Sequence, residues 1–272
     1  MNNTLKMTLF WILAVVITLS AAMYQRLTGP THPKRMSLTT ENTIYKVRLV
    51  RSHGGDADCP LKFNIANNEI SGTVTYKRYH TNDEWLSAEL KRDGEFLVAS
   101  LPHQPPAGKI EYKISFLKGG KTLNNPEDYH VVVRFKGGVP NFILIPHVLL
   151  MFIAMLLSNL VGILAVAKHK KMVFYTNLTF IILLVGGMIY GPLMQLYAFG
   201  ELWTGFPKGM DLTDNKTLIA FVFWIVAVIM NRKKQRPVWI IVASIIMLAI
   251  YLIPHSALGS ELNYESGTII TG

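Results

Sequence analysis

Two histidines that follow prolines offer the nitrogen ligands that a haem or a transition metal needs. His147 follows Pro146 near the start of one apolar segment, and His255 follows Pro254 at the end of another. Three further side chains lie at helical steps of three or four residues on the faces of apolar segments, namely Tyr190, Met194 and Tyr251. This set could hold a haem b as an electron-transfer centre. A second interpretation stays open, in which both imidazoles only satisfy helix ends or water at the membrane surface.

An acidic, aromatic stretch at residues 200–216 is the other candidate site. It lies between two apolar segments and reads G-E-L-W-T-G-F-P-K-G-M-D-L-T-D-N-K. Carboxylates at Glu201, Asp211 and Asp214 could bind a divalent cation, which would make the chain a metal-dependent membrane enzyme. The simpler alternative is that the aspartates cap a helix that begins here, because carboxylates are favoured at helix N-termini.

Motifs for covalent catalysis are missing from the sequence. It contains no G-x-S-x-G element, no phosphate-binding G-x-x-x-x-G-K-[ST] and no dinucleotide fingerprint. Cys59 is the only cysteine, so an intrachain disulfide is ruled out. The sequence therefore leaves the question of catalysis open and favours a protein that is not an enzyme over the metal-dependent alternative.

The composition is that of a membrane protein. Half of the 272 residues are hydrophobic and only 16% are charged. Apolar segments at 142–167 and 172–199 are long enough to cross a bilayer, which takes roughly 20 residues. The segment at 218–230 is too short unless its helix starts earlier, with Thr213 or Asp214 as its N-cap. A fourth segment covers 238–253, so residues 139–256 are predicted to form a four-helix transmembrane domain.

A fifth apolar segment lies at the N-terminus, over 7–23. Its length fits an uncleaved anchor, although Ser20-Ala21-Ala22 resembles a signal-peptide cleavage site. We expect an anchor, followed by a stiff, non-helical connector from Tyr24 because Gly29, Pro30 and Pro33 disfavour a helix. Residues 1–35 are thus the predicted anchor and linker.

Residues 36–138 have the pattern of a β-sandwich. Seven short runs of strand-forming residues are separated by turn signals, and several alternate between apolar and polar positions. The runs cover 44–50, 61–65, 72–78, 85–90, 96–101, 110–116 and 130–135. Tight turns are predicted at Gly94 and at the Gly119-Gly120 pair. Spacing of this kind is typical of immunoglobulin-like or fibronectin-like domains.

Charge placement predicts the orientation in the membrane. The turns around 168–171 and 232–236 carry seven basic residues and no acidic one, and such turns stay in the cytoplasm. The N-terminus is then inside, while the β-sandwich and the 200–216 stretch are outside. In a bacterium with two membranes that compartment is the periplasm. Residues 257–272 form a small polar tail that we expect to lie loosely on the outer side.

These features together predict an accessory or scaffold subunit of an envelope complex in the bacterial inner membrane. Its partners would be the lipid bilayer and other membrane or periplasmic proteins. Nucleic acid is an unsuitable partner: the net charge is +10, but residues 36–136 carry 14 basic and 12 acidic residues, so the exported region is nearly neutral.

Overall fold

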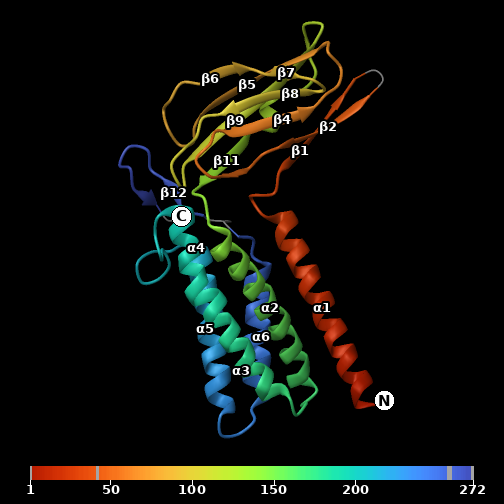
Figure 1. Cartoon of the computed structure of the whole chain (residues 1–272), viewed down its shortest axis with the longest axis vertical. Helices are drawn as coiled ribbons and strands as arrows, with labels where there is room; N and C mark the ends of the chain where they lie inside the picture. The colour runs from red at the N-terminus through yellow and green to blue at the C-terminus, as the bar shows by residue number, and fades with distance from the viewer. Residues whose placement is uncertain (1, 41–42, 256–258, 271–272) are drawn as a thin grey trace. The chain divides into compact units, whose positions relative to one another are not determined.

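The computed structural model describes residues 2–40, 43–255 and 259–270. The chain combines helices and sheets, which confirms the prediction of an α+β protein, and it divides into two compact units (Figure 1). We call the first the helical unit; it comprises the described residues up to Pro30 and those within Val139–Gly259. The second, the β unit, comprises the described residues of Thr31–Gly138 and Ser260–Ile270.

The helical unit contains α1 (Asn3–Thr28), α2 (Asn141–Val166), α3 (Met172–Leu183), the π-helical segment η2 (Leu184–Ile189), α4 (Tyr190–Phe199), α5 (Leu212–Asn231) and α6 (Pro237–Leu252). Since α3, η2 and α4 join into one helix over Met172–Phe199, the described residues hold four helices long and apolar enough to cross a membrane. The fifth helix, α6, is apolar but has only 16 residues, a length of about 24 Å.

Two helix ends differ from the sequence prediction. Asp211 is the N-cap of α5, accepting hydrogen bonds from the backbone N–H groups of Thr213 and Asp214, so the predicted cap at Thr213 or Asp214 is wrong. The first helix continues to Thr28 instead of ending before Tyr24. It stops where the sequence offers Gly29 and then Pro30, because neither residue favours a further turn.

Close contact between small residues holds α2 against α6. A Cβ added at Gly162 would lie 2.3 Å from the Ser244 Oγ, so only glycine fits there. The Ser244 hydroxyl donates to the Ser158 carbonyl oxygen at 2.8 Å. On the other side of α2, the Asn159 amide donates to the Thr18 hydroxyl of α1 at 2.9 Å. Small residues and interhelical hydrogen bonds of this kind are the usual means of packing helices in an apolar solvent.

The β unit contains four sheets within the described residues. Sheet order is β1-β2, β3-β11-β9-β5-β6 with β10 beside β9, β4-β8-β7, and β12-β13. The strands are β1 (Lys34–Thr39), β2 (Ile44–Leu49), β3 (Ser52–Gly54), β4 (Cys59–Asn64), β5 (Ile70–Arg78), β6 (Leu86–Glu89), β7 (Lys91–Asp93), β8 (Phe96–Leu101), β9 (Lys109–Lys118), β10 (Lys121–Thr122), β11 (Val131–Lys136), β12 (Glu261–Leu262) and β13 (Ile269–Ile270), and a short 3₁₀ helix covers Pro126–Tyr129. Neighbouring strands are antiparallel except β11 and β3, which are parallel.

One hydrophobic core joins three of these sheets. Leu38 comes from β1, Phe63 from β4 and Phe116 from β9, and each is at most 1% exposed. The rings of Phe63 and Phe116 meet edge to face with their centroids 5.7 Å apart. All seven predicted strands are present within one or two residues of their predicted ends, whereas β1 and the short strands β3, β7, β10, β12 and β13 were not predicted.

The C-terminal segment is more ordered than the loose tail that the sequence suggested. Leu262 of β12 and Ile269 of β13 pair in a short hairpin. The Tyr264 hydroxyl accepts a hydrogen bond from the Lys109 N–H and donates to the Lys109 carbonyl, each at 2.9 Å. Burial of this phenol raises its pKa to about 12. Residues 260–270 therefore belong to the β unit by their contacts.

Candidate functional site

The stretch after α4 folds onto the start of α5 through one carboxylate. Helix α4 ends at Phe199 and is capped by Gly200, whose φ of +84° suits glycine. Beyond it, the Asp214 Oδ2 accepts hydrogen bonds from the Thr204 N–H at 2.6 Å, the Gly205 N–H at 3.1 Å and the Thr204 hydroxyl at 3.2 Å. Both Thr204 and Gly205 are buried, so these groups depend on the carboxylate instead of water. Asp214 thus fixes the loop to the helix.

Further hydrogen bonds close the same loop. The Gln195 amide of α4 donates to the Thr204 hydroxyl at 2.8 Å, and both residues are buried. The Asn215 side-chain oxygen accepts from the Phe206 N–H at 2.7 Å. The Trp203 indole donates to the Phe206 carbonyl at 3.0 Å. The stretch therefore forms a closed loop at one end of the helical unit.

Lys216 is a buried cation one turn into α5. Its side chain is 5% exposed, and its ammonium donates to the Ile253 carbonyl at 2.9 Å and the Pro254 carbonyl at 3.4 Å. These carbonyls follow the last turn of α6, where helix geometry leaves oxygens without partners. Lys216 therefore caps the C-terminal end of α6, a role that also suits a positive charge near the negative end of the helix dipole.

His147 binds the π-helical segment. Its Nδ1 lies 2.9 Å from the Gly186 carbonyl oxygen, in η2. Because a carbonyl only accepts, Nδ1 carries the proton, and Nε2 of the neutral ring keeps its lone pair. Glycine is needed here, since a Cβ at Gly186 would lie 2.7 Å from the Leu150 Cβ. A π turn of this kind breaks the regular helix ladder and often occurs at functional sites.

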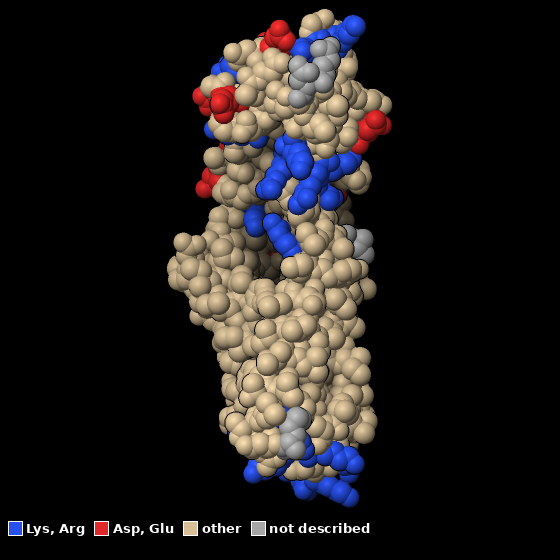
Figure 2. Space-filling model, turned by 90° about the vertical axis from the view of Figure 1, so that its right-hand side faces the viewer, with Lys and Arg blue, Asp and Glu red and all other residues tan. Residues whose placement is uncertain are grey.

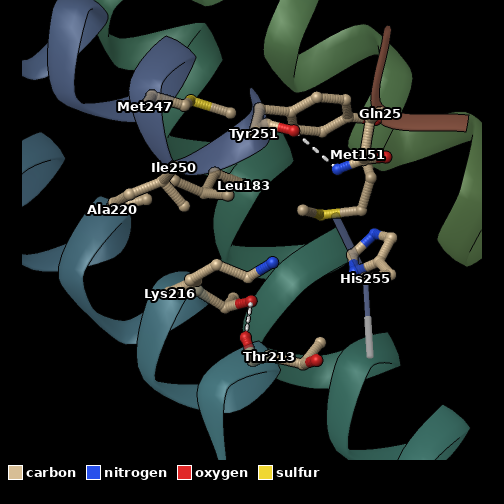
Figure 3. A pocket seen from close by; sticks show the side chains of 11 residues that line it. Gln25, Met151, Leu183, Thr213, Lys216, Ala220, Met247, Ile250, Tyr251 and His255 are labelled. Carbon is tan, nitrogen blue, oxygen red and sulfur yellow. Dashed lines mark hydrogen bonds between the residues drawn. The ribbon is translucent and has the colours of Figure 1, made fainter. Parts of the chain in front are cut away.

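A small cavity lies among the helices beside Lys216 and His255 (Figure 3). The cavity volume is about 30 Å³, enough for roughly two water molecules. In Figure 3 the Lys216 ammonium and the His255 ring are directed toward the same space. The lining residues are Gln25, Met151, Leu183, Thr213, Lys216, Thr217, Ala220, Met247, Ile250, Tyr251 and His255. The Gln25 amide of α1 donates to the Tyr251 carbonyl at 2.6 Å, so α1 closes one side.

The predicted haem residues fall into two groups. His255 and Tyr251 line the cavity, whereas His147, Tyr190 and Met194 are not among its lining residues. The cavity therefore brings together only two of the five predicted haem residues. The haem hypothesis stays a prediction.

The predicted metal ligands are occupied by other partners or lie in solvent. Asp211 and Asp214 accept backbone hydrogen bonds, and Glu201 is exposed. Within residues 2–40, 43–255 and 259–270, no group of three or more His, Cys, Asp or Glu side chains is arranged to hold a metal ion. The metal site stays a prediction, and the geometry gives these aspartates a structural role.

Three residues that form hydrogen bonds in this region were not identified from the sequence. Gln25 and Gln195 are polar residues in helices that otherwise read as apolar, and such residues in membrane segments face protein partners. This signal was available for Gln195, whereas Gln25 lies in the stretch predicted as a non-helical connector, so no such signal marked it. Thr204 had no such signal, because its role depends on the folded loop.

Comparison with known proteins finds no family model, no curated protein and no solved structure that matches the chain. The function is therefore argued from the geometry alone.

Proposed function

We propose that the chain is an integral protein of the bacterial inner membrane with five spans, its N-terminus inside and its β unit in the periplasm. Four long apolar helices support this, with α6 as a shorter fifth span. On the face that Figure 2 shows, the middle of the helical unit lacks charged residues, while Lys and Arg gather at its lower end. In Figure 1 that end holds the start of α1 and the turns α2–α3 and α5–α6. Basic turns remain in the cytoplasm.

The proposal includes an immunoglobulin-like sandwich for the β unit. In such domains one sheet contains strands C, F and G, and the other contains B, E and D. Taking β4 as B, β5 as C, β7 as D, β8 as E, β9 as F and β11 as G, the orders β11-β9-β5-β6 and β4-β8-β7 follow this arrangement, with β6 in the place of C′. The shared core of the two sheets supports the same arrangement.

The role we propose is that of a non-catalytic accessory or scaffold subunit of an envelope complex. The immunoglobulin-type strand order carries this proposal, because many cell-surface domains share this sandwich architecture. Large apolar side chains also remain exposed on the helices, as Phe142, Phe174 and Val238 illustrate. These side chains are suited to lipid or to neighbouring membrane subunits.

Crosslinking in the native host tests the subunit role. A photoreactive residue at exposed Ser71 of β5 is expected to give one discrete adduct with a partner, at native expression level. The matched control has the same residue at exposed Phe174 of α3, where lipid contact should give mainly diffuse products. The proposal fails if the protein extracted in mild detergent is a lone chain and surface positions across the β unit give no discrete adduct.

One observation favours a second candidate, a haem b electron-transfer subunit. Histidines that ligate metals usually donate their other ring N–H to a backbone carbonyl, which fixes the tautomer. His147 has this arrangement with Gly186, and Nε2 is left as the available ligand. The visible spectrum of the purified protein distinguishes the two candidates.

A further inference from the structure

The hairpin β1–β2 carries three cations on one face, and its described residues include no acidic side chain; Glu41, between the two strands, lies outside the described residues. Arg35 lies directly opposite Arg48 across the two strands, and the next pair on that face is Ser37 with Lys46. All four residues are exposed. The opposite face is apolar and packs into the core through four side chains, Met36, Leu38, Val47 and Leu49.

No carboxylate among the described residues lies within ion-pair distance of these cations. Several acidic side chains of the unit pair with other residues, for example Asp83 with Arg78 and Glu127 with Lys113. Lys34, on the inner side of the hairpin, contacts the Asp128 carbonyl and the Tyr129 ring. Figure 2 views the molecule from the side where β1 and β2 lie in Figure 1, and Lys and Arg side chains gather in one group on the β unit there.

The arrangement is unfavourable for folding by itself. Like charges directly opposite each other on a sheet destabilise the pair. Arg35 and Arg48 therefore cost stability unless an anion lies between or beside them. A feature that opposes stability at an exposed position is characteristic of a binding surface.

We infer that this outer face of the hairpin, formed by Arg35, Ser37, Lys46 and Arg48, docks an acidic, extended segment of a partner protein. The inference rests on the proposed subunit role, since it names the partner chemistry for that role. Arginine binds carboxylates in two-point geometry, and the serine hydroxyl can donate to the same groups. Successive outward residues on a strand are roughly 6.7 Å apart, which matches alternate side chains of an extended peptide.

Other features of the face favour a peptide over a lipid surface. Recognition of anionic lipid typically uses four to eight clustered basic residues, and here there are three. Ile44, opposite Thr39 at the end of the same face, is 62% exposed and offers apolar contact beyond the cations. A folded surface of mixed charge, hydroxyl and apolar groups is typical of protein recognition.

Binding of a fluorescein-labelled peptide of ten glutamates tests the inference directly. The full chain is placed in nanodiscs of phosphatidylcholine, and fluorescence anisotropy gives the dissociation constant at low and high salt. The variant R35Q/K46Q/R48Q is expected to bind about tenfold more weakly, equivalent to about 1.4 kcal/mol. The control K91Q/K121Q/K136Q removes three exposed lysines from β7, β10 and β11 and should change binding less than twofold.

A charge reversal keeps the test decisive if the neutral variant folds poorly. R35E/K46E/R48E is expected to bind a labelled peptide of ten lysines and to lose the glutamate peptide. Equal weakening in the neutral and control variants would overturn the inference, since only net charge would then matter. Binding to phosphatidylglycerol vesicles without binding to the peptide would overturn it in favour of lipid.

Crosslinking and co-purification with the native partner test this inference separately from the subunit role. If R35Q/K46Q/R48Q still forms the Ser71 adduct and co-purifies with the partner, the docking surface is wrong and the subunit role stands. If the wild-type chain has no partner, the subunit role is wrong whatever the peptide result.

Discussion

Removing the Asp214 carboxylate is expected to release the loop between α4 and α5. In Asp214→Ala the buried N–H groups of Thr204 and Gly205 lose their acceptor. Each unsatisfied group costs about 1–3 kcal/mol, and the loss of a buried carboxylate offsets part of this cost. The loop should therefore be destabilised by about 2–4 kcal/mol, which corresponds to an opening equilibrium roughly 30-fold to 1000-fold larger.

Trypsin cleavage after the exposed Lys208 measures that opening. Cleavage of a transiently open segment follows the population of the open form when closing is fast. Asp214→Asn keeps an acceptor oxygen and should accelerate cleavage less than tenfold, and Glu201→Gln, at an exposed position, should not change it. Mass spectrometry of the fragment that begins at Gly209 isolates this site from other cleavages.

The same assay distinguishes a structural carboxylate from a metal ligand. A chelator should leave the wild-type cleavage rate unchanged if Asp214 acts through Thr204 and Gly205. Cleavage of Asp214→Ala within threefold of the wild type would refute the reasoning. A wild type that opens on chelation would instead favour the metal hypothesis for this loop.

Three further predictions concern other parts of the chain. Gly162→Ala forces a Cβ against the Ser244 Oγ and should cost about 1–3 kcal/mol; thermal unfolding in detergent measures the loss, and Ser244→Gly should restore part of it. Arg48→Thr removes a like-charge pair with Arg35 and should raise the melting temperature of the β unit by about 1–4 °C; an unchanged or lower value would contradict the repulsion. Protein from a haem-replete host should show no stoichiometric Soret band if the chain is a scaffold, whereas a band lost in both His147→Ala and His255→Ala would favour electron transfer.

The local sequence pattern was sufficient to predict the strands and turns that depend only on neighbouring residues. Strand β8 was predicted at its observed bounds, because its apolar run lies between clear turn signals. The turns at Gly94, Gly119 and Gly120 all have positive φ, as a tight hairpin requires. Strand β1 was missed because its pattern contains only two buried apolar residues, Met36 and Leu38, after a proline-rich connector.

The site depended on contacts between distant segments, which the sequence does not report. Lys216 caps carbonyls 37 and 38 residues away, and His147 binds a carbonyl 39 residues away. The histidines and aspartates were singled out from the sequence as candidate ligands, whereas their hydrogen-bond partners are set by helix packing. The π-helical turn at Gly186 has no sequence signal of its own, since it depends on how closely α2 approaches.

Membrane orientation is the central claim, and labelling of single cysteines with a membrane-impermeant maleimide tests it most directly. The native Cys59 gives little background, because it is buried and burial raises its pKa to about 11. In intact spheroplasts, Ser71→Cys on the β unit should be labelled, and Lys170→Cys in the α2–α3 turn should react only after lysis. Labelling of Lys170→Cys in intact spheroplasts would contradict the orientation, and with it the periplasmic role of the β unit.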